Sequence, residues 1–127
     1  MGTFLLIGAG GFLGAVLRYL LSTYVQNWTK LTQFPIGTLA VNILGCLFIG
    51  VLAQLAEARD IFTPEASAFI FLGFLGAFTT FSTFSSDSFN LFQDSQSLLF
   101  YLNIGANVIL GLGAVWAGRN LTAYLIQ

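Results

Sequence analysis

The stretch GAFTTFSTF at residues 76–84 lies inside an apolar segment long enough to cross a membrane. Four of its nine residues carry a hydroxyl, Phe81 and Phe84 stand three residues apart, and no residue is charged. Ser and Thr side chains compete for backbone hydrogen bonds, so the stretch predicts an interrupted helix. At membrane depth, an interrupted helix needs protein, water or an ion to satisfy its backbone groups. We therefore expect the functional site in this stretch.

The composition of the 127-residue chain is typical of a membrane protein. The chain is 57% hydrophobic and 7% charged, whereas soluble domains carry roughly 25% charged residues. Four apolar segments, at about residues 4–25, 36–56, 66–92 and 98–124, each reach the roughly 20 residues that a helical span needs. The predicted fold is an all-α membrane protein, a single domain over residues 1–127 with four transmembrane helices, the third of them broken.

Residue counts exclude several function classes. The chain has no histidine and one cysteine, Cys46, which rules out a His/Cys metal site and a disulfide within one chain. The net charge of −1 gives no reason to expect a nucleic-acid partner. The sequence shows no nucleophile–base pair and no cofactor loop, so we do not expect an enzyme.

Glycines recur within the spans. The stretch GAGGFLG at residues 8–14 lacks the spacing of a dinucleotide-binding loop. Gly10 and Gly14 instead make a G-x-x-x-G step, which lets two helices approach closely. The same packing role is expected for the other span glycines, Gly45, Gly50, Gly105, Gly111, Gly113 and Gly118.

The four basic residues are divided evenly between the two faces of the predicted bundle. Arg59 and Arg119 belong to the face that holds both termini, and Lys30 and Arg18 belong to the opposite side. Orientation in the membrane follows Lys/Arg asymmetry, and here there is none. Either the chain inserts in both orientations and pairs as an antiparallel dimer, or one orientation prevails by other means.

Polar residues inside the spans are candidates for function. Thr38 and Asn42 share one face of the second span, and an asparagine amide can donate two hydrogen bonds to an anion without a permanent charge. Asn103 and Asn107 repeat this spacing on the fourth span. All of these could equally join helices by hydrogen bonds. Arg18 is either a functional residue of the membrane interior or a side chain that extends to the interface.

The third span predicts a specific arrangement. In a broken helix, the carbonyls of Gly76 and Thr79, doubled by a two-fold axis, would form a four-oxygen site for a hard cation. The hydroxyls of Ser82 and Thr83 would line a wet track. The two phenylalanines of the stretch could turn their electropositive ring edges toward an anion, although phenylalanines at this spacing commonly serve only packing.

Three motifs, one in each of the first three spans, resemble those of a known family, and the similarity covers essentially the whole chain. GFLGAVLRY at 11–19, GTLAVN at 37–42 and GFLGAFTTFSTFSSD at 73–87 resemble the Fluc (CrcB) fluoride channels of bacteria. The resemblance implies a dual-topology antiparallel homodimer in the bacterial inner membrane, with two pores through which toxic fluoride leaves the cell passively.

The same resemblance assigns individual residues. It implies a structural, untransported sodium ion held by the backbone carbonyls of Gly76 and Thr79. It places the pore phenylalanines at Phe81 and Phe84 and the second-span asparagine at Asn42. The candidates for the fourth-span pore residues are Tyr101, Asn103 and Asn107.

The main alternative is a small dual-topology multidrug exporter that exchanges cations for protons. Such an exporter needs a titratable carboxylate inside the membrane. The first two spans hold no acidic residue except Glu57 at a boundary, and Asp87 comes late in the third span, where we expect it near the interface. A purely structural membrane subunit is a second alternative, but it would need no hydroxyl track.

Overall fold

The computed structural model describes residues 1–127, and every regular element in it is helical. Helices α1 (Gly2–Thr29), α2 (Ile36–Arg59) and α6 (Ser97–Leu125) are continuous. These three helices, together with the segment Pro64–Gln93, are long and apolar enough to cross a membrane. The predicted all-α fold with four spans is confirmed, and the chain is a multi-pass membrane protein.

The third span is assembled from short pieces. It begins with α3 (Pro64–Ser67), continues as the π-helix η1 (Ala68–Leu75) and α4 (Gly76–Phe78), and ends with α5 (Phe81–Gln93). Between α4 and α5, Thr79 and Thr80 are extended, with ψ angles of 156° and 116°. The helix is therefore interrupted inside the hydroxyl-rich stretch. The π-helix before the interruption was not expected from the sequence.

Threonine side chains cap the first and the last helix of this span at their N-termini. Thr63 accepts a hydrogen bond from the Ala66 backbone N–H, and Pro64 occupies the first turn of α3. Thr80 does the same for α5, where its hydroxyl accepts the backbone N–H of Thr83 at 3.2 Å. Side-chain oxygens at such positions satisfy donors that a helix start leaves without a partner. The same threonine that interrupts the span thus restarts it.

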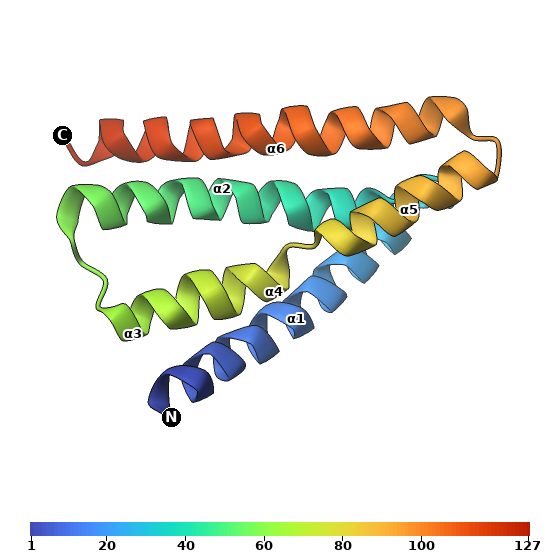
Figure 1. The fold of residues 1–127 in the computed structure, drawn as a ribbon. Coiled ribbons are helices and arrows are strands. Elements are labelled where there is room, and N and C mark those ends of the chain that lie inside the picture. The colour runs from blue at the N-terminus through green and yellow to red at the C-terminus, as the bar shows by residue number, and fades with distance from the viewer.

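The four spans pack as two pairs (Figure 1). Helices α2 and α6 run side by side in the same direction, and α1 packs against η1 and α4. α1 runs opposite to α2 and diverges from it toward the N-terminus, so that η1 and α4 lie in the widening space between them. α5 leaves this space and contacts α6 beyond the interruption.

Glycines allow the closest contacts within both pairs. A Cβ atom on Gly10 or Gly14 would collide with backbone carbonyl oxygens of the third span, and one on Gly50 or Gly118 would collide with backbone across the α2–α6 contact. The packing role expected for these residues is confirmed. Gly105 and Gly113 of α6 pack against no other helix of this chain, because an added Cβ would meet nothing within 4 Å, and their packing role stays a prediction.

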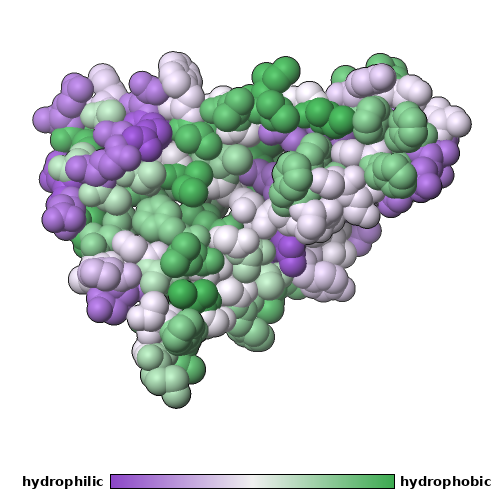
Figure 2. Space-filling view, in the orientation of Figure 1, coloured by the Kyte–Doolittle hydropathy of each residue, from purple (hydrophilic) through white to green (hydrophobic).

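The single chain buries little of its apolar surface. Only 17 of 127 residues are buried, and large hydrophobic side chains are exposed along every span. Figure 2 shows hydrophobic residues over most of one face, with hydrophilic residues gathered mainly at the two ends toward which the helices point. An exterior of this kind must be covered by lipid or by other protein.

Candidate functional site

The interruption of the third span is bound by the side chain of Asn42. The Asn42 Oδ1 atom accepts the backbone N–H of Thr80 at 2.8 Å, and its Nδ2 atom donates to the Thr80 carbonyl at 3.1 Å. One side-chain amide thus satisfies both backbone groups of an extended residue, which is the requirement for irregular backbone at membrane depth. α2 and the interruption are thereby fixed to each other.

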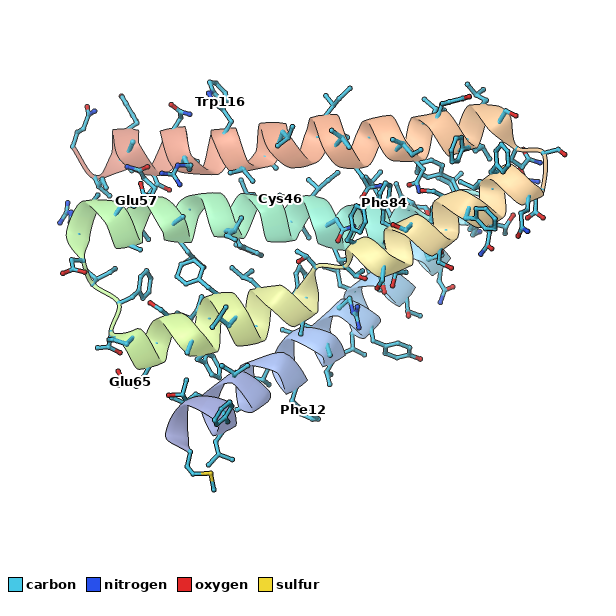
Figure 3. All side chains as sticks on the ribbon, viewed as in Figure 1. Phe12, Cys46, Glu57, Glu65, Phe84 and Trp116 are labelled. Carbon is cyan, nitrogen blue, oxygen red and sulfur yellow. The ribbon has the colours of Figure 1, made fainter.

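A cavity of about 380 Å³ opens beside this contact, and we call it the aromatic cavity. None of its lining residues is charged. The Phe81 and Phe84 rings lie on its wall with centroids 5.5 Å apart. Figure 3 shows Phe84 beside α2, close to where α5 begins. The full lining is Asn42, Gly45, Cys46, Ile49, Phe71, Leu75, Gly76, Thr79, Thr80, Phe81, Phe84, Asn107 and Val108.

A series of side-chain hydrogen bonds leads from this cavity into α6 and back to α5. The Asn42 Nδ2 atom donates to Asn107 Oδ1 at 3.1 Å, and Asn107 Nδ2 donates to the carbonyl and side-chain oxygens of Asn103. Asn103 is 1% exposed and donates to Ser88 Oγ at 2.9 Å. Ser88 in turn donates to the Phe84 carbonyl at 2.8 Å. Polar groups in a low-dielectric interior are tolerated when they are paired in this way.

A second cavity, of about 470 Å³, lies near the connection between α1 and α2, and we call it the polar cavity. Thr38 and Asp87 face each other on its wall, where the Thr38 hydroxyl donates to Asp87 Oδ2 at 3.0 Å. Gln26 shapes one side, because its amide accepts from the Gly37 N–H and donates to carbonyls of the connection. The other lining residues are Ser22, Thr23, Asn27, Thr32, Gln33, Phe34, Pro35, Asn90, Leu91 and Asp94.

The structure brings some of the predicted site residues together and leaves others apart. Those on the aromatic cavity are Asn42, Gly76, Thr79, Phe81, Phe84 and Asn107. Thr38 lines the polar cavity, and Asn103 is buried behind Asn107. Ser82, Thr83, Tyr101 and Arg18 line neither cavity. Tyr101 is 69% exposed, and Arg18 makes no ion pair, since the one salt bridge joins Arg119 and Glu57.

Sequence reasoning missed three contributors to these sites. Thr80 and Ser88 are not among the predicted site residues, although Thr80 binds the Asn42 amide and Ser88 joins Asn103 to the Phe84 carbonyl. Asp87, expected near the interface, lines the polar cavity as the partner of Thr38. The sequence does contain a signal for the polar cavity. Polar residues recur at i, i+4 near the end of α1, Ser22 with Gln26 and Thr23 with Asn27, and all four line this cavity.

Comparison with known proteins places the chain in one family. The family model described as CrcB-like protein, Camphor Resistance (CrcB), matches residues 5–119. The fluoride-specific ion channel FluC 1 of Methanosarcina acetivorans is 48% identical over 98% of this chain and 97% of its own length. The fluoride-specific ion channel FluC of Maridesulfovibrio salexigens is 43% identical over the full length of both chains. That of Flavobacterium psychrophilum is 40% identical over 93% of this chain and 94% of its own. The chain therefore belongs to the CrcB family.

Proposed function

We propose that this protein is a fluoride-specific ion channel that lets toxic fluoride leave the cell passively. The observation that carries the proposal is the aromatic cavity, in which the Asn42 amide and the rings of Phe81 and Phe84 meet at the interruption of a membrane span. Relatives that match over nearly their whole length are named fluoride-specific ion channels. A channel performs no covalent chemistry, which agrees with the absence of a catalytic pattern in the sequence.

The chemistry of the cavity suits a small, strongly hydrated anion. A pore has to replace the water of such an ion with donors, yet hold it weakly enough for it to leave. An amide N–H group and the electropositive edges of aromatic rings supply donors without a fixed positive charge. The cavity wall contains no lysine or arginine that would trap the ion.

The proposed channel is an antiparallel homodimer that inserts in both orientations. Its support is the even division of Arg59 and Arg119 against Lys30 and Arg18, and the large apolar surface that one chain leaves exposed. Phe81, which is 79% exposed, would be covered by a second copy. The hydroxyls of Ser82 and Thr83 are also exposed in the single chain, where a track between two copies could use them.

A structural sodium ion is part of the proposal. Thr79 is extended, and its carbonyl accepts no hydrogen bond within the chain, so it is free to bind a cation. Gly76 lies one turn earlier at the surface of the chain. Two such carbonyls from each of two copies would give a set of hard oxygen ligands, which fits an alkali cation, and a charged side chain is not required.

Anion efflux from liposomes that contain the purified protein tests the function. Fluoride-loaded liposomes should discharge once a cation ionophore relieves the charge imbalance, and chloride-loaded liposomes should not. Equal efflux of the two anions would contradict the proposed selectivity. Strict dependence on a proton gradient would instead favour a coupled exporter.

Single-cysteine labelling tests the proposed topology. On a Cys46→Ala background, a cysteine placed in the loop that holds Asp60 should react with an impermeant reagent in about half of the chains. Complete labelling from one side would show a single orientation. Adding lysines to one terminus should bias the orientation and lower the efflux.

A further inference from the structure

The side-chain amide of Asn42 has no free donor in this structure. Its Nδ2 atom carries two hydrogens, and both have acceptors at 3.1 Å, the Thr80 carbonyl and Asn107 Oδ1. Its Oδ1 atom accepts the backbone N–H of Thr80. An anion in the aromatic cavity can therefore bind this amide only after it displaces one of the two acceptors.

The two acceptors differ in how readily they can be displaced. The bond to Thr80 is half of a reciprocal pair, and breaking it would leave a backbone carbonyl of the interruption without a partner, which is costly away from water. Asn42 and Asn107, by contrast, are joined by only one hydrogen bond, which links two side chains. Asn107 is half-buried and lines the same cavity. The hydrogen that points toward Asn107 is the one that an anion takes at the lower cost.

We propose that Asn107 is a positioning residue whose Oδ1 atom holds the Asn42 amide between ions and competes with fluoride for the same N–H. This inference rests on the proposed channel function and deepens it. The Asn107 side chain is held with its Oδ1 atom toward Asn42, because its Nδ2 atom donates to Asn103 O at 2.9 Å and to Asn103 Oδ1 at 3.1 Å. Asn103 is held in turn by Ser88 on α5.

Competition of this kind gives the channel a way to release its ion. While fluoride occupies the Asn42 N–H, the Asn107 oxygen remains nearby as an alternative acceptor. Its return to the amide lowers the net affinity for fluoride and speeds departure, which conduction requires. Removing the Asn107 acceptor should therefore make the channel bind fluoride more tightly and pass it more slowly. Simple damage to the structure would not tighten binding.

The test compares Asn107→Leu with the matched variant Asn120→Leu in liposomes. Asn120 lies on the same helix, is exposed, and bonds only to the Trp116 carbonyl of its own helix turn. Initial fluoride efflux is measured as a function of internal fluoride, which gives a maximal rate and a half-saturating concentration. Losing a competitor worth one net hydrogen bond, about 1 kcal/mol, should lower the half-saturating concentration about fivefold. The maximal rate should fall as well, while Asn120→Leu keeps both values.

The alternatives predict other results. If Asn107 were itself a fluoride ligand, Asn107→Leu would raise the half-saturating concentration. If Asn107 only joined helices, the maximal rate would fall and the half-saturating concentration would stay unchanged. Either result would overturn the inference while leaving wild-type fluoride efflux, and hence the proposed function, intact. Asn107→Ala removes the same acceptor without adding apolar bulk, and it should shift both quantities in the same direction if the leucine variant does not fold.

Discussion

The two halves of the third span are held in place by different forces. The first half, residues 64–78, approaches α1 through backbone, because Gly10, Gly14 and Gly73 have no side chain to keep the helices apart. The second half, α5, is held by side-chain hydrogen bonds that run from Asn42 and Asn103. A side chain added at one of these glycines should therefore destabilise the packing of the first half. Loss of a side-chain donor or acceptor should destabilise the second half.

The two ways of holding the third span are the two that a lipid environment leaves open. Lipid offers helices no hydrophobic drive to associate, so association depends on close packing at small residues and on hydrogen bonds. The first half uses the packing and contains no buried polar side chain. The second half uses the hydrogen bonds, and no buried side-chain polar atom in the chain lacks a partner. The half that is held by paired donors is also the one that carries Phe81 and Phe84.

The largest loss of stability is expected from Gly14→Ala. The new Cβ would collide with the Phe74 carbonyl oxygen and crowd the Phe78 N–H, and neither backbone group can move without shifting the span. Such overpacking costs up to about 3 kcal/mol, which SDS-induced unfolding in mixed micelles can measure. Gly8→Ala is the matched control, since its Cβ would meet nothing within 4 Å. If both variants unfold alike, close packing does not hold the first half.

A smaller loss is expected from Asn42→Leu. This change leaves the N–H and the carbonyl of Thr80 without their protein partners, and an unsatisfied buried group costs about 1–3 kcal/mol. We expect the free energy of unfolding to fall by about 2 kcal/mol and fluoride efflux to be lost. Normal stability in the same unfolding assay would show that water satisfies the interruption equally well.

Phe81→Ile and Phe84→Ile should affect flux more than stability. Isoleucine keeps an apolar side chain in the aromatic cavity but removes the ring edge, and swaps of this kind usually cost less than about 1.5 kcal/mol. We expect both variants to elute as the wild type does in size-exclusion chromatography, with sharply reduced fluoride efflux at one or both positions. If both variants conduct normally, the two rings serve only packing.

The sequence predicted the parts of this comparison that depend on local composition. Four spans follow from segment length, and the interruption at Thr79 and Thr80 lies within the hydroxyl-rich stretch because hydroxyls compete for backbone bonds there. The π-helix could not be foreseen, since it has no local signature that separates it from an α-helix. The pore and sodium assignments stay predictions.

Other features depend on how the helices are rotated against each other. Gly111 and Gly118 are seven residues apart and lie on the buried face of α6, because seven residues make about two helical turns. Gly113 lies on another, exposed face, which explains why it packs against no other helix of this chain. The pairing of Asn42 with Asn107 likewise requires the relative height of α2 and α6, which no spacing within one helix reveals.

Thr79→Ser should give the smallest change, and it separates the main-chain role of this residue from its side-chain role. The Thr79 methyl group lies where a Cβ on Gly45 would be, and the hydroxyl donates to the Leu75 carbonyl at 3.0 Å. Serine keeps the hydroxyl and the carbonyl and loses one methyl group, whose burial is worth about 0.8 kcal/mol.

Efflux is then compared in sodium and in a bulky organic cation, with Thr79→Val as the variant that keeps the shape and removes the hydroxyl. If main-chain oxygens bind the ion, both variants should respond to sodium as the wild type does. A response lost only in Thr79→Val would move the ligand from the carbonyl to the hydroxyl.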